Sequence, residues 1–523
     1  MRLLVTILLS SALAVIQAIS TAWGQENSLT QLPETVVTGT PETGSLTTPT
    51  TAESRTELDR VPGGTTVVDQ ELIHDRAQQG VEEVLSFAPG VYAESFDNGA
   101  DARISIRGSG ILQGAGFISG VRLLRDGLPL TRALGYANAE QVDLLSISHL
   151  EVYRGANALE YGAATLGGAI NFVSPTGYTA DRLRVGMRGG SDTYLRPYFS
   201  SGGVLGNGFD YYVSGSGVDT DGFRRRDSFN HEWYAGANLG YRSTDRHETR
   251  VFFNFSDQRY GVPGPLFQRE LEEDPARVTD AFCPGCRNRE QFYRVALTHT
   301  AQLRERDRLE VGASYLLYPG LVSTLPGIGL AFRSRTEDVA YNLRHEVYLP
   351  LWGRENRVVW GVLYTSGDAT ERLFLLAPPE GGTRALIRRQ EFEGENAEFF
   401  VQDHFALTDS LTLVPGFQVA HAKREQQDVL PTPSRTINED YTAVSPKFGV
   451  LWQATEVVQL FANVSRSFEP PIAGFGPNFV NLDPETGAAT VLDEQRATTL
   501  EVGTRGRSGR VHWEVAAYHA WVK

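Results

Sequence analysis

Residues Ala397–Val419 read AEFFVQDHFALTDSLTLVPGFQV, which is two alternating segments joined by a short polar turn. In the first segment the odd positions are mostly apolar, while Glu398, Gln402 and His404 occupy even positions. The second segment repeats the alternation from Leu411 onward. Because successive side chains of a strand point to opposite faces, each segment has one apolar and one polar face. This pattern is expected of a strand that separates lipid from a water-filled lumen.

The same alternation continues from about residue 181 to Lys523 and is divided by connections of two lengths. Tight turns and long polar loops follow one another, as in outer-membrane barrels with periplasmic turns and external loops. The tight turns are 243–246, 304–307, 408–410 and 454–456, and the long loops are 219–231, 257–290, 367–390, 424–441 and 468–496. We count about fifteen strands, the last at Val511–Val522. Since such barrels have an even number of strands, we expect either further strands beyond Lys523, which we favour, or completion by other chains.

Composition excludes two classes of protein. No run beyond residue 24 approaches the ~20 apolar residues of a spanning helix, and the mean hydropathy is -0.25. The net charge of -15 argues against a nucleic-acid partner, which would require a basic surface. The apolar run after Arg2 is a secretory signal peptide over residues 1–24, cut after Ala22 or Gly24.

Residues 25–60 are poor in apolar side chains and are predicted to form a mobile periplasmic arm. Within this arm, residues 32–40 read LPETVVTGT and have the β-branched content of a strand without a neighbouring partner. An unpaired strand of this kind is a candidate for pairing with the sheet of another protein.

A compact mixed α/β domain follows at residues 61–178. A short helix is expected at Gln79–Phe87, and short strands at Ile104–Arg107, Val121–Asp126 and His149–Arg154. Many glycines separate these elements. The segment has the size of an ordinary domain and precedes the barrel at 181–523.

The chain has two cysteines, Cys283 and Cys286, in the sequence Cys-Pro-Gly-Cys. In an exported protein this pair is expected to close a small loop disulfide. Redox or metal roles are less favoured, because no helix or βαβ unit surrounds the pair and two thiolates make at most half of a zinc site. We therefore predict no bound metal and no cofactor.

Several motifs, in this order, resemble the TonB-dependent receptor family. Residues 147–155 (ISHLEVYRG) and 161–172 (YGAATLGGAINF) resemble the end of that family's plug, and 104–108 (ISIRG) and 125–130 (RDGLPL) resemble earlier parts of it. In the barrel, 400–403, 445–449 and 467–470 resemble family strand signatures. The resemblance covers nearly the whole chain. It implies a mainly β fold, a transmembrane antiparallel barrel of 22 strands when complete, with an α/β plug inside the lumen.

The resemblance also implies an energy-coupling segment and a latch. The family's TonB box corresponds to Glu34, Thr35, Val36, Val37 and Thr38, which would pair with the TonB protein of the inner membrane. Arg107 and Arg154 match plug arginines that lie against barrel glutamates in the family. Glu469 and Glu501 are the candidate partners, with independent solvated charges as the alternative.

Ligand contacts in the family come from the plug's apical loops and the outer barrel loops. By that analogy the candidates are Gln113, Phe117, Arg132 and Tyr136 in the plug. In an outer loop, Arg224 and Arg225 could attract an anionic chelate through a focused positive field, although such arginines are more often merely solvated.

The sequence therefore predicts a receptor of the Gram-negative outer membrane that actively imports a ferric chelate such as ferric citrate or a siderophore. The expected partners are TonB, outer-membrane lipid and a small metal chelate, and we expect a monomer. Import of cobalamin, another metal complex or a glycan remains open, as does a passive porin. No nucleophile, base and orienting group form a recognisable motif, so we do not expect an enzyme.

Overall fold

The computed structural model describes residues 44–74, 80–96, 101–110, 118–161, 166–278, 284–326, 329–377, 382–430, 435–474, 480–482, 489–509 and 511–523. Residues Gly44–Lys523 form one compact unit. The predicted signal peptide at 1–24 and the predicted coupling box at 34–38 lie outside the described residues. Within the described part of the chain, no helix is both long and apolar enough to cross a membrane.

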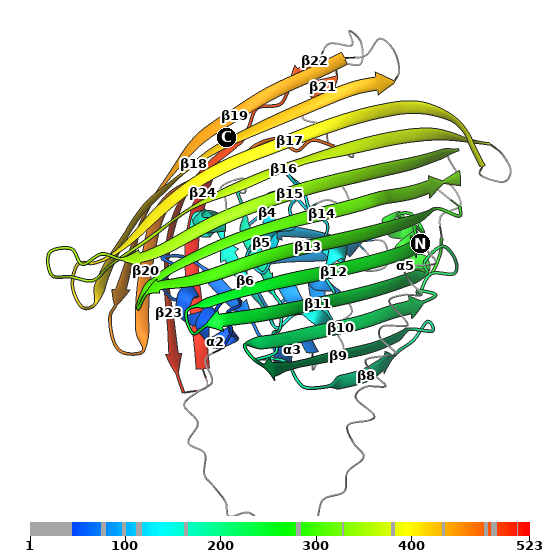
Figure 1. The fold of residues 1–523 in the computed structure, drawn as a ribbon. Helices are drawn as coiled ribbons and strands as arrows, with labels where there is room; N and C mark the ends of the chain where they lie inside the picture. Colours follow the sequence, from blue (N-terminus) through cyan, green and yellow to red (C-terminus); the bar gives the residue numbers. More distant parts are fainter. Residues whose placement is uncertain are drawn as a thin grey trace, which may run out of the picture. The chain divides into compact units, whose positions relative to one another are not determined.

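A large antiparallel sheet dominates the described structure (Figure 1). It has 15 strands among the described residues, neighbours in the sheet are neighbours in the chain apart from a loop insertion, and β8 and β24 are the edge strands. The strands are β8 (Arg184–Gly189), β9 (Leu195–Gly206), β10 (Phe209–Thr220), β11 (Asn230–Thr244), β12 (His247–Gly261), β13 (Arg287–Arg304), β14 (Asp307–Leu325), β15 (Leu330–Tyr348), β16 (Asn356–Ala377), β17 (Gly382–Ala406), β18 (Leu411–Leu430), β19 (Arg435–Gln453), β20 (Val458–Glu469), β23 (Gln495–Ser508) and β24 (Val511–Val522). Loops carry the helix α5 (Gln268–Glu273) and the hairpin β21 (Val480–Leu482) and β22 (Ala489–Val491). The predicted mainly β fold and the predicted last strand are confirmed.

Strand register places the apolar side chains in a continuous outer belt. Tyr341 lies opposite Tyr364, and Phe399 opposite Val419, which in turn lies opposite Val444. Such belt side chains are exposed although they are large and apolar: Phe253 41%, Val295 49%, Tyr341 53%, Val362 42%, Phe399 39%, Val419 36% and Val444 59%. The neighbours on the other face, such as Glu398 and Gln418, are buried. The alternation predicted from the sequence therefore separates an apolar outer face from a polar inner face, as in a membrane barrel.

All four predicted tight turns are present, since strands end and restart at 244 and 247, 304 and 307, 406 and 411, and 453 and 458. Two predicted long loops are wrong. Most of 367–390 and of 424–441 belongs to strands, and Gly367 pairs with Asp338 and with Gly394. Backbone hydrogen bonds between neighbouring strands hold these extensions together. The strands therefore continue through residues that are polar on both faces of the sheet.

The plug is a small mixed domain around a five-stranded sheet of order β1-β6-β7-β4-β5. Strands β4 and β7 are parallel, and the other pairs are antiparallel. Its elements are α2 (Thr51–Leu58), β1 (Thr65–Val68), α3 (Gln70–His74), α4 (Val81–Leu85), β2 (Val91–Phe96), β3 (Asp101–Ile106), β4 (Val121–Arg125), β5 (Leu128–Pro129), the 3-10 turns η2 (Ala139–Gln141), η3 (Leu144–Ser146) and η4 (Gly155–Tyr161), β6 (His149–Arg154) and β7 (Gly168–Val173).

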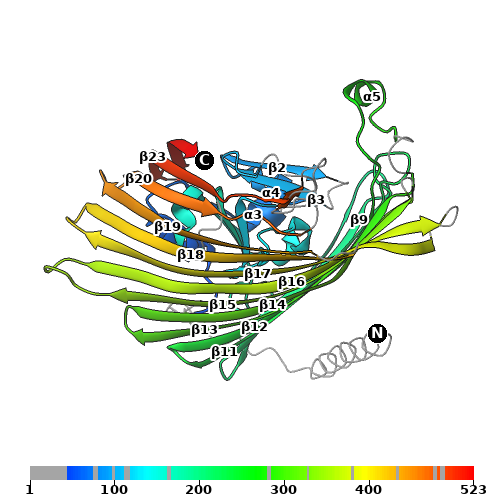
Figure 2. The same cartoon turned by 90° about the horizontal axis from the view of Figure 1, so that it is seen from above.

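The plug has its own apolar core, which includes Leu123, Val152 and Ile170, each without exposed surface. Figure 2 shows the long strands curving with the plug elements on their concave side. Phe292, Leu316 and Tyr318 of the large sheet join the same core cluster. The plug is therefore held by apolar contacts with the wall as well as by polar ones.

Two local expectations need correction. The predicted helix at 79–87 is shorter, since α4 spans Val81–Leu85. The mobile arm predicted to end at residue 60 is also too long, because α2 lies at Thr51–Leu58. Thr50 and Glu53 form a capping box at its start, and Leu58 packs in an apolar cluster. Few apolar residues suffice in α2, because Leu58 packs against other buried residues of the plug.

Candidate functional site: the interface between plug and barrel

Arg107 and Glu501 meet across the boundary between the plug and strand β23. They form a buried ion pair, with the side chains 8% and 1% exposed. The carboxylate of Glu501 also accepts hydrogen bonds from the Gly64 amide at 3.0 Å and from the Asn157 and Asn463 amides at 3.0 and 3.1 Å. A buried carboxylate is tolerated when it is paired and hydrogen-bonded in this way. The contact supports the latch predicted between these two residues.

Arg154 pairs with a glutamate that the sequence argument missed. Its guanidinium lies 3.0 Å from Glu514 on β24 and donates to the Pro89 carbonyl at 2.6 Å. The other predicted partner, Glu469, instead accepts a hydrogen bond from the Leu166 backbone amide at 3.4 Å. Within the described residues, Glu469 forms no ion pair with either plug arginine, so its proposed place in the latch is replaced by Glu514.

Strand pairing could have identified Glu514. Arg505 shares the inner-face parity of Glu501 on β23, and Glu514 lies directly opposite Arg505. Arg505 donates to the carbonyls of Leu58 and Val61, at 2.7 and 2.8 Å, and thus contacts the plug as well. The register of β23 against β24 identifies Glu514 as the partner, and spacing in the sequence alone does not specify that register.

Two further ion pairs join plug and wall away from the latch. Arg122 of β4 binds Glu398 of β17 through both nitrogens, at 2.7 and 3.2 Å. Asp143 of the plug lies 2.9 Å from Arg196 of β9. All four side chains are at most 5% exposed. Such dry pairs resist separation, because removing one partner leaves an uncompensated buried charge.

The plug also contains a buried polar cluster that anchors α2. Ser54 of α2 lies 2.8 Å from His149 Nε2, and Asn171 donates to Glu151 at 2.9 Å. Burial would raise the pKa of Glu151, but hydrogen bonding and charge from His149, with further hydrogen bonds from Asn171 and Ser54, lower it overall. Burial, and then the nearby Glu151, hold the pKa of Tyr153 well above its usual value. The cluster therefore keeps a carboxylate charged inside the plug.

The apical loop of the plug carries two of the predicted ligand contacts, and both are covered. Arg132 is 7% exposed and Tyr136 1%, and the Arg132 guanidinium lies over the rings of Tyr136 and Tyr318 at 4.6 and 3.9 Å. The Ala473 amide donates to the Leu134 carbonyl at 3.0 Å, so residues next to β20 pass over this loop. In this conformation Arg132 and Tyr136 contact protein groups, and their role with a ligand stays a prediction.

The other predicted contacts are dispersed. Arg224 donates to the Gly264 carbonyl at 2.7 Å, and Arg225 pairs with Asp274 at 2.6 Å, both in outer loops. Gln113 and Phe117 lie outside the described residues.

The predicted loop disulfide is only half described. Cys286 is buried and disulfide-bonded. Cys283 falls outside the described residues, so the pairing stays a prediction. Within the part of the chain that the structure describes, no group of three or more His, Cys, Asp or Glu side chains could hold a metal ion.

The plug segment and the barrel segment each match a known protein family. The family described as TonB-dependent Receptor Plug Domain matches residues 57–169. The vitamin B12 transporter BtuB of Vibrio vulnificus (strain CMCP6) is 27% identical over 187 residues, 36% of this chain and 29% of the relative. The probable TonB-dependent siderophore receptor PiuA of Acinetobacter baumannii (strain ATCC 19606) is 26% identical over 204 residues, 38% of this chain and 25% of the relative. The aligned parts thus span less than a third of these curated relatives.

Solved structures share the fold over most of the chain. The unliganded ferric citrate transporter FecA aligns with a TM-score of 0.76 at 18% identity, covering 89% of this chain and 70% of that one. The ferric yersiniabactin uptake receptor FyuA from Yersinia pestis aligns with a TM-score of 0.72 at 17% identity, covering 88% and 72%. The relatives and neighbours are transporters and receptors rather than enzymes, as expected from the sequence. The family described as TonB dependent receptor-like, beta-barrel matches residues 159–523, and the chain therefore belongs to the TonB-dependent receptor family.

Proposed function

We propose that this protein is an outer-membrane receptor that actively imports a ferric chelate, with residues 34–38 as the segment that pairs with TonB. TonB-dependent receptors are β-barrel proteins of the Gram-negative outer membrane. The observation that carries the proposal is the latched plug: Arg107–Glu501 and Arg122–Glu398 are buried pairs that join the plug to the wall. Removing one partner of such a pair leaves an uncompensated buried charge, at a cost of about 3–5 kcal/mol, so we expect displacement of the plug to require an energy input.

The ligand class is supported by arginines and by the neighbours. Arg224 and Arg225 lie in outer loops, where arginines can attract an anionic complex, although Arg225 is itself paired with Asp274. The structural neighbours include a ferric citrate transporter and a ferric yersiniabactin receptor. An anionic iron chelate is therefore the proposed ligand. Cobalamin is the second candidate, because the curated relative BtuB is a vitamin B12 transporter.

The test is uptake of radiolabelled ferric citrate, a ferric catecholate, a ferric hydroxamate and cobalamin by cells that express the receptor. Val36→Pro is the matched variant, since proline removes a backbone donor and blocks strand pairing. Accumulation of one iron chelate by the wild type, lost in Val36→Pro, supports the proposal. Uptake that is unaffected by Val36→Pro would favour a passive porin, and accumulation of cobalamin alone would reassign the ligand.

A further inference from the structure

A cavity of about 310 Å³ separates the plug from one part of the wall. It is lined on the wall side by residues of β13 to β17, and on the plug side by residues of β4, β6, β7, η4 and α2. Arg306, in the turn between β13 and β14, and Val311 both line it. At ~3.4 Å per residue these positions are roughly 17 Å apart along the strand. The cavity therefore runs inward from the end of the sheet that carries the short turns.

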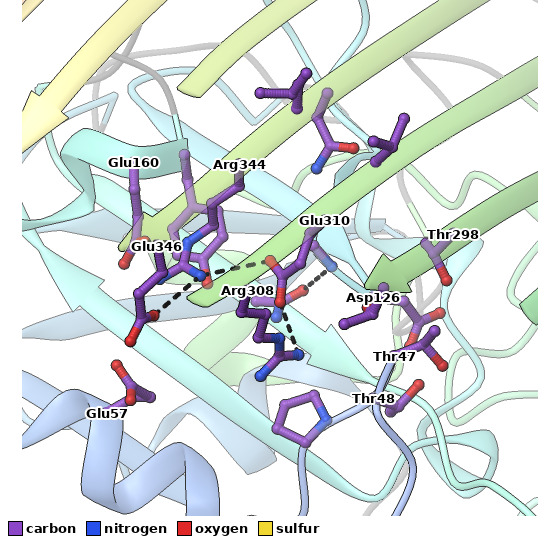
Figure 3. Close-up of a pocket in the computed structure, with 18 of the residues that line it drawn as sticks. Thr47, Thr48, Glu57, Asp126, Glu160, Thr298, Arg308, Glu310, Arg344 and Glu346 are labelled. Carbon is purple, nitrogen blue, oxygen red and sulfur yellow. Dashed lines mark hydrogen bonds and ion pairs between the residues drawn. The ribbon is translucent and has the colours of Figure 1, made fainter. Parts of the chain in front are cut away.

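Charged groups from both sides meet around this cavity (Figure 3). Arg344 of β15 lies 2.9 Å from Glu160 of the plug, and 3.5 and 3.6 Å from Glu310 and Glu346 of the wall. Arg308 lies 2.7 Å from Glu310. The polarity across the boundary is the reverse of the latch, because here the wall supplies the arginine and the plug supplies the glutamate.

The ion pairs around the cavity are partly exposed to solvent and will be called wet. The neighbouring pairs Arg122–Glu398 and Asp143–Arg196 are buried and will be called dry. Arg344 and Glu160 are 18% and 23% exposed, and Arg308 and Glu310 36% and 26%. Partly exposed pairs cost less to separate than fully buried ones, because water can hydrate the freed charges. Arg344 also divides its contacts among three carboxylates. An incoming carboxylate can therefore replace Glu160 without leaving a buried charge unpaired.

The end of the cavity near the short turns is lined by the segment 45–49, which we call the stopper. Thr47, Thr48 and Pro49 line the cavity, and Arg308 donates to the Leu46 carbonyl at 2.7 Å. The buried Glu248 of β12 accepts hydrogen bonds from Ser45 Oγ at 2.6 Å, from the Leu46 amide at 2.8 Å and from Thr47 Oγ1 at 2.8 Å. The stopper is thus bound to the wall, and it follows the predicted coupling segment at 34–38 in the chain.

We propose that this cavity is the start of the passage for an anionic chelate, with Arg308 and Arg344 as its transit site. Pulling the arm withdraws the stopper, and carboxylates of the chelate replace Glu160 beside Arg344. The plug then separates from the wall around Arg308 and Arg344, at the short-turn end of β14 and β15, while the buried pairs Arg122–Glu398 and Asp143–Arg196 hold. A larger cavity, about 890 Å³, lies beside the edge strand β24 and is lined by the latch residues Arg107, Arg154 and Glu514. Beside it the shorter plug–wall pairs, Arg107–Glu501 and Arg154–Glu514, have the arginine on the plug, whereas the wall arginine Arg505 lies 4.0 Å from Asp59 of the plug. This inference rests on the proposed import of an anionic chelate.

Two pairs of cysteines test the side on which the plug must open. Glu160→Cys/Arg344→Cys bridges the cavity, and Asp143→Cys/Arg196→Cys is the matched control, because each native pair is a plug carboxylate 2.9 Å from a wall arginine. Cells that express the full receptor are treated with a bifunctional thiol reagent that a reductant releases. Binding and uptake of radiolabelled ferric citrate are measured before and after release, with the wild type treated identically.

Arg344→Cys itself removes the transit charge, so the reference is the same variant after reduction. Against that reference, cross-linked Glu160→Cys/Arg344→Cys should lose at least tenfold in uptake, with unchanged binding. The cross-linked control should lose less than twofold. An equal loss of uptake in both cross-linked pairs would mean that the plug leaves as a whole. No loss in either pair would mean that the boundary between plug and wall stays closed during uptake. Either outcome would overturn the proposed passage. If the untreated wild type accumulates no ferric citrate, the proposed ligand fails, which is distinct from a side-specific result.

The transit site has its own test. Arg344→Gln should slow ferric citrate uptake about fivefold with unchanged surface binding, and Arg344→Lys should recover most of the rate because it restores the charge. An unchanged rate in Arg344→Gln, or no recovery in Arg344→Lys, would overturn the role of this charge.

Discussion

The plug meets the wall through two kinds of ion pair. Arg122 and Glu398 are 4% and 2% exposed and bond through two nitrogens, whereas Arg344 and Glu160 are 18% and 23% exposed and share the arginine with other carboxylates. Dry pairs are costly to break because each partner depends on the other. Wet pairs can exchange partners with water or ligand. One interface thus combines fully buried ion pairs with partly exposed ones.

The largest expected effect is the loss of a dry pair. Among the described residues, Arg122→Ala leaves Glu398 buried with Gln418, at 3.3 Å, as its remaining donor, and the change should destabilise plug docking by about 3–5 kcal/mol. Hydrogen exchange of the β4 amides measures the loss. The double variant Arg122→Met/Glu398→Leu removes both charges and should recover most of the protection. A change below about 1 kcal/mol in Arg122→Ala would contradict the distinction between the two sides.

A smaller effect is expected when Glu501 loses its charge but keeps its shape. Glu501→Gln retains an acceptor for the Gly64 amide but weakens the contact with Arg107, at a cost of about 1.5–3 kcal/mol. Protease sensitivity of the plug in detergent reports this loss. Glu469→Gln is the control, because Glu469 contacts a backbone amide rather than an arginine, and it should show the smaller change. Equal sensitivity in both variants would remove Glu501 from the latch.

Neutralising the wet pair should change stability least among the charge variants. Glu160→Gln leaves Arg344 beside Glu310 and Glu346, so plug docking should weaken by about 1 kcal/mol or less. The same hydrogen-exchange measurement on β4 and η4 gives a direct comparison with Arg122→Ala. A loss as large as that of Arg122→Ala would show that the cavity side is as rigid as the dry side.

Raising the salt concentration should produce the smallest effect on hydrogen exchange. It should act on the partly exposed pairs around Glu160 and not on the buried Arg122–Glu398 pair. Raising the salt concentration from about 0.05 to 0.5 M shortens the screening length and weakens exposed pairs, while buried pairs change little. Exchange of the η4 amides around Glu160 should rise by about twofold, with that of the β4 amides unchanged. Parallel acceleration in both elements would indicate general loosening of the plug rather than a difference between its sides.

The sequence predicted most of what depends on local pattern. Strand β24 at Val511–Val522, strand β6 at His149–Arg154 and the four tight turns agree with the structure. Alternation and turn residues encode these features within a few positions of the chain. The extensions of β16 to β19 were missed because pairing of backbones across strands leaves no alternation in their polar side chains.

The candidate site was only partly predictable for a related reason. Arg107 and Glu501 were identified from motif and parity, and the structure brings them together. Glu514 was missed because its position opposite Arg505 depends on the register of β23 and β24. Burial of Arg132 and Tyr136 depends on residues 470–474, far away in the chain, so spacing around the apical loop could not reveal it.

The sequence by itself determined a mixed domain followed by alternating strands, since period and turn spacing are local properties, and the family resemblance identified that domain as a plug. Only the tertiary structure decided which charges meet, which of them are dry, and where a cavity opens between plug and wall. The Arg122–Glu398 ion pair and the Ser45–Glu248 hydrogen bond join residues far apart in sequence. Their strength depends on exclusion of water, which packing creates and no stretch of sequence contains.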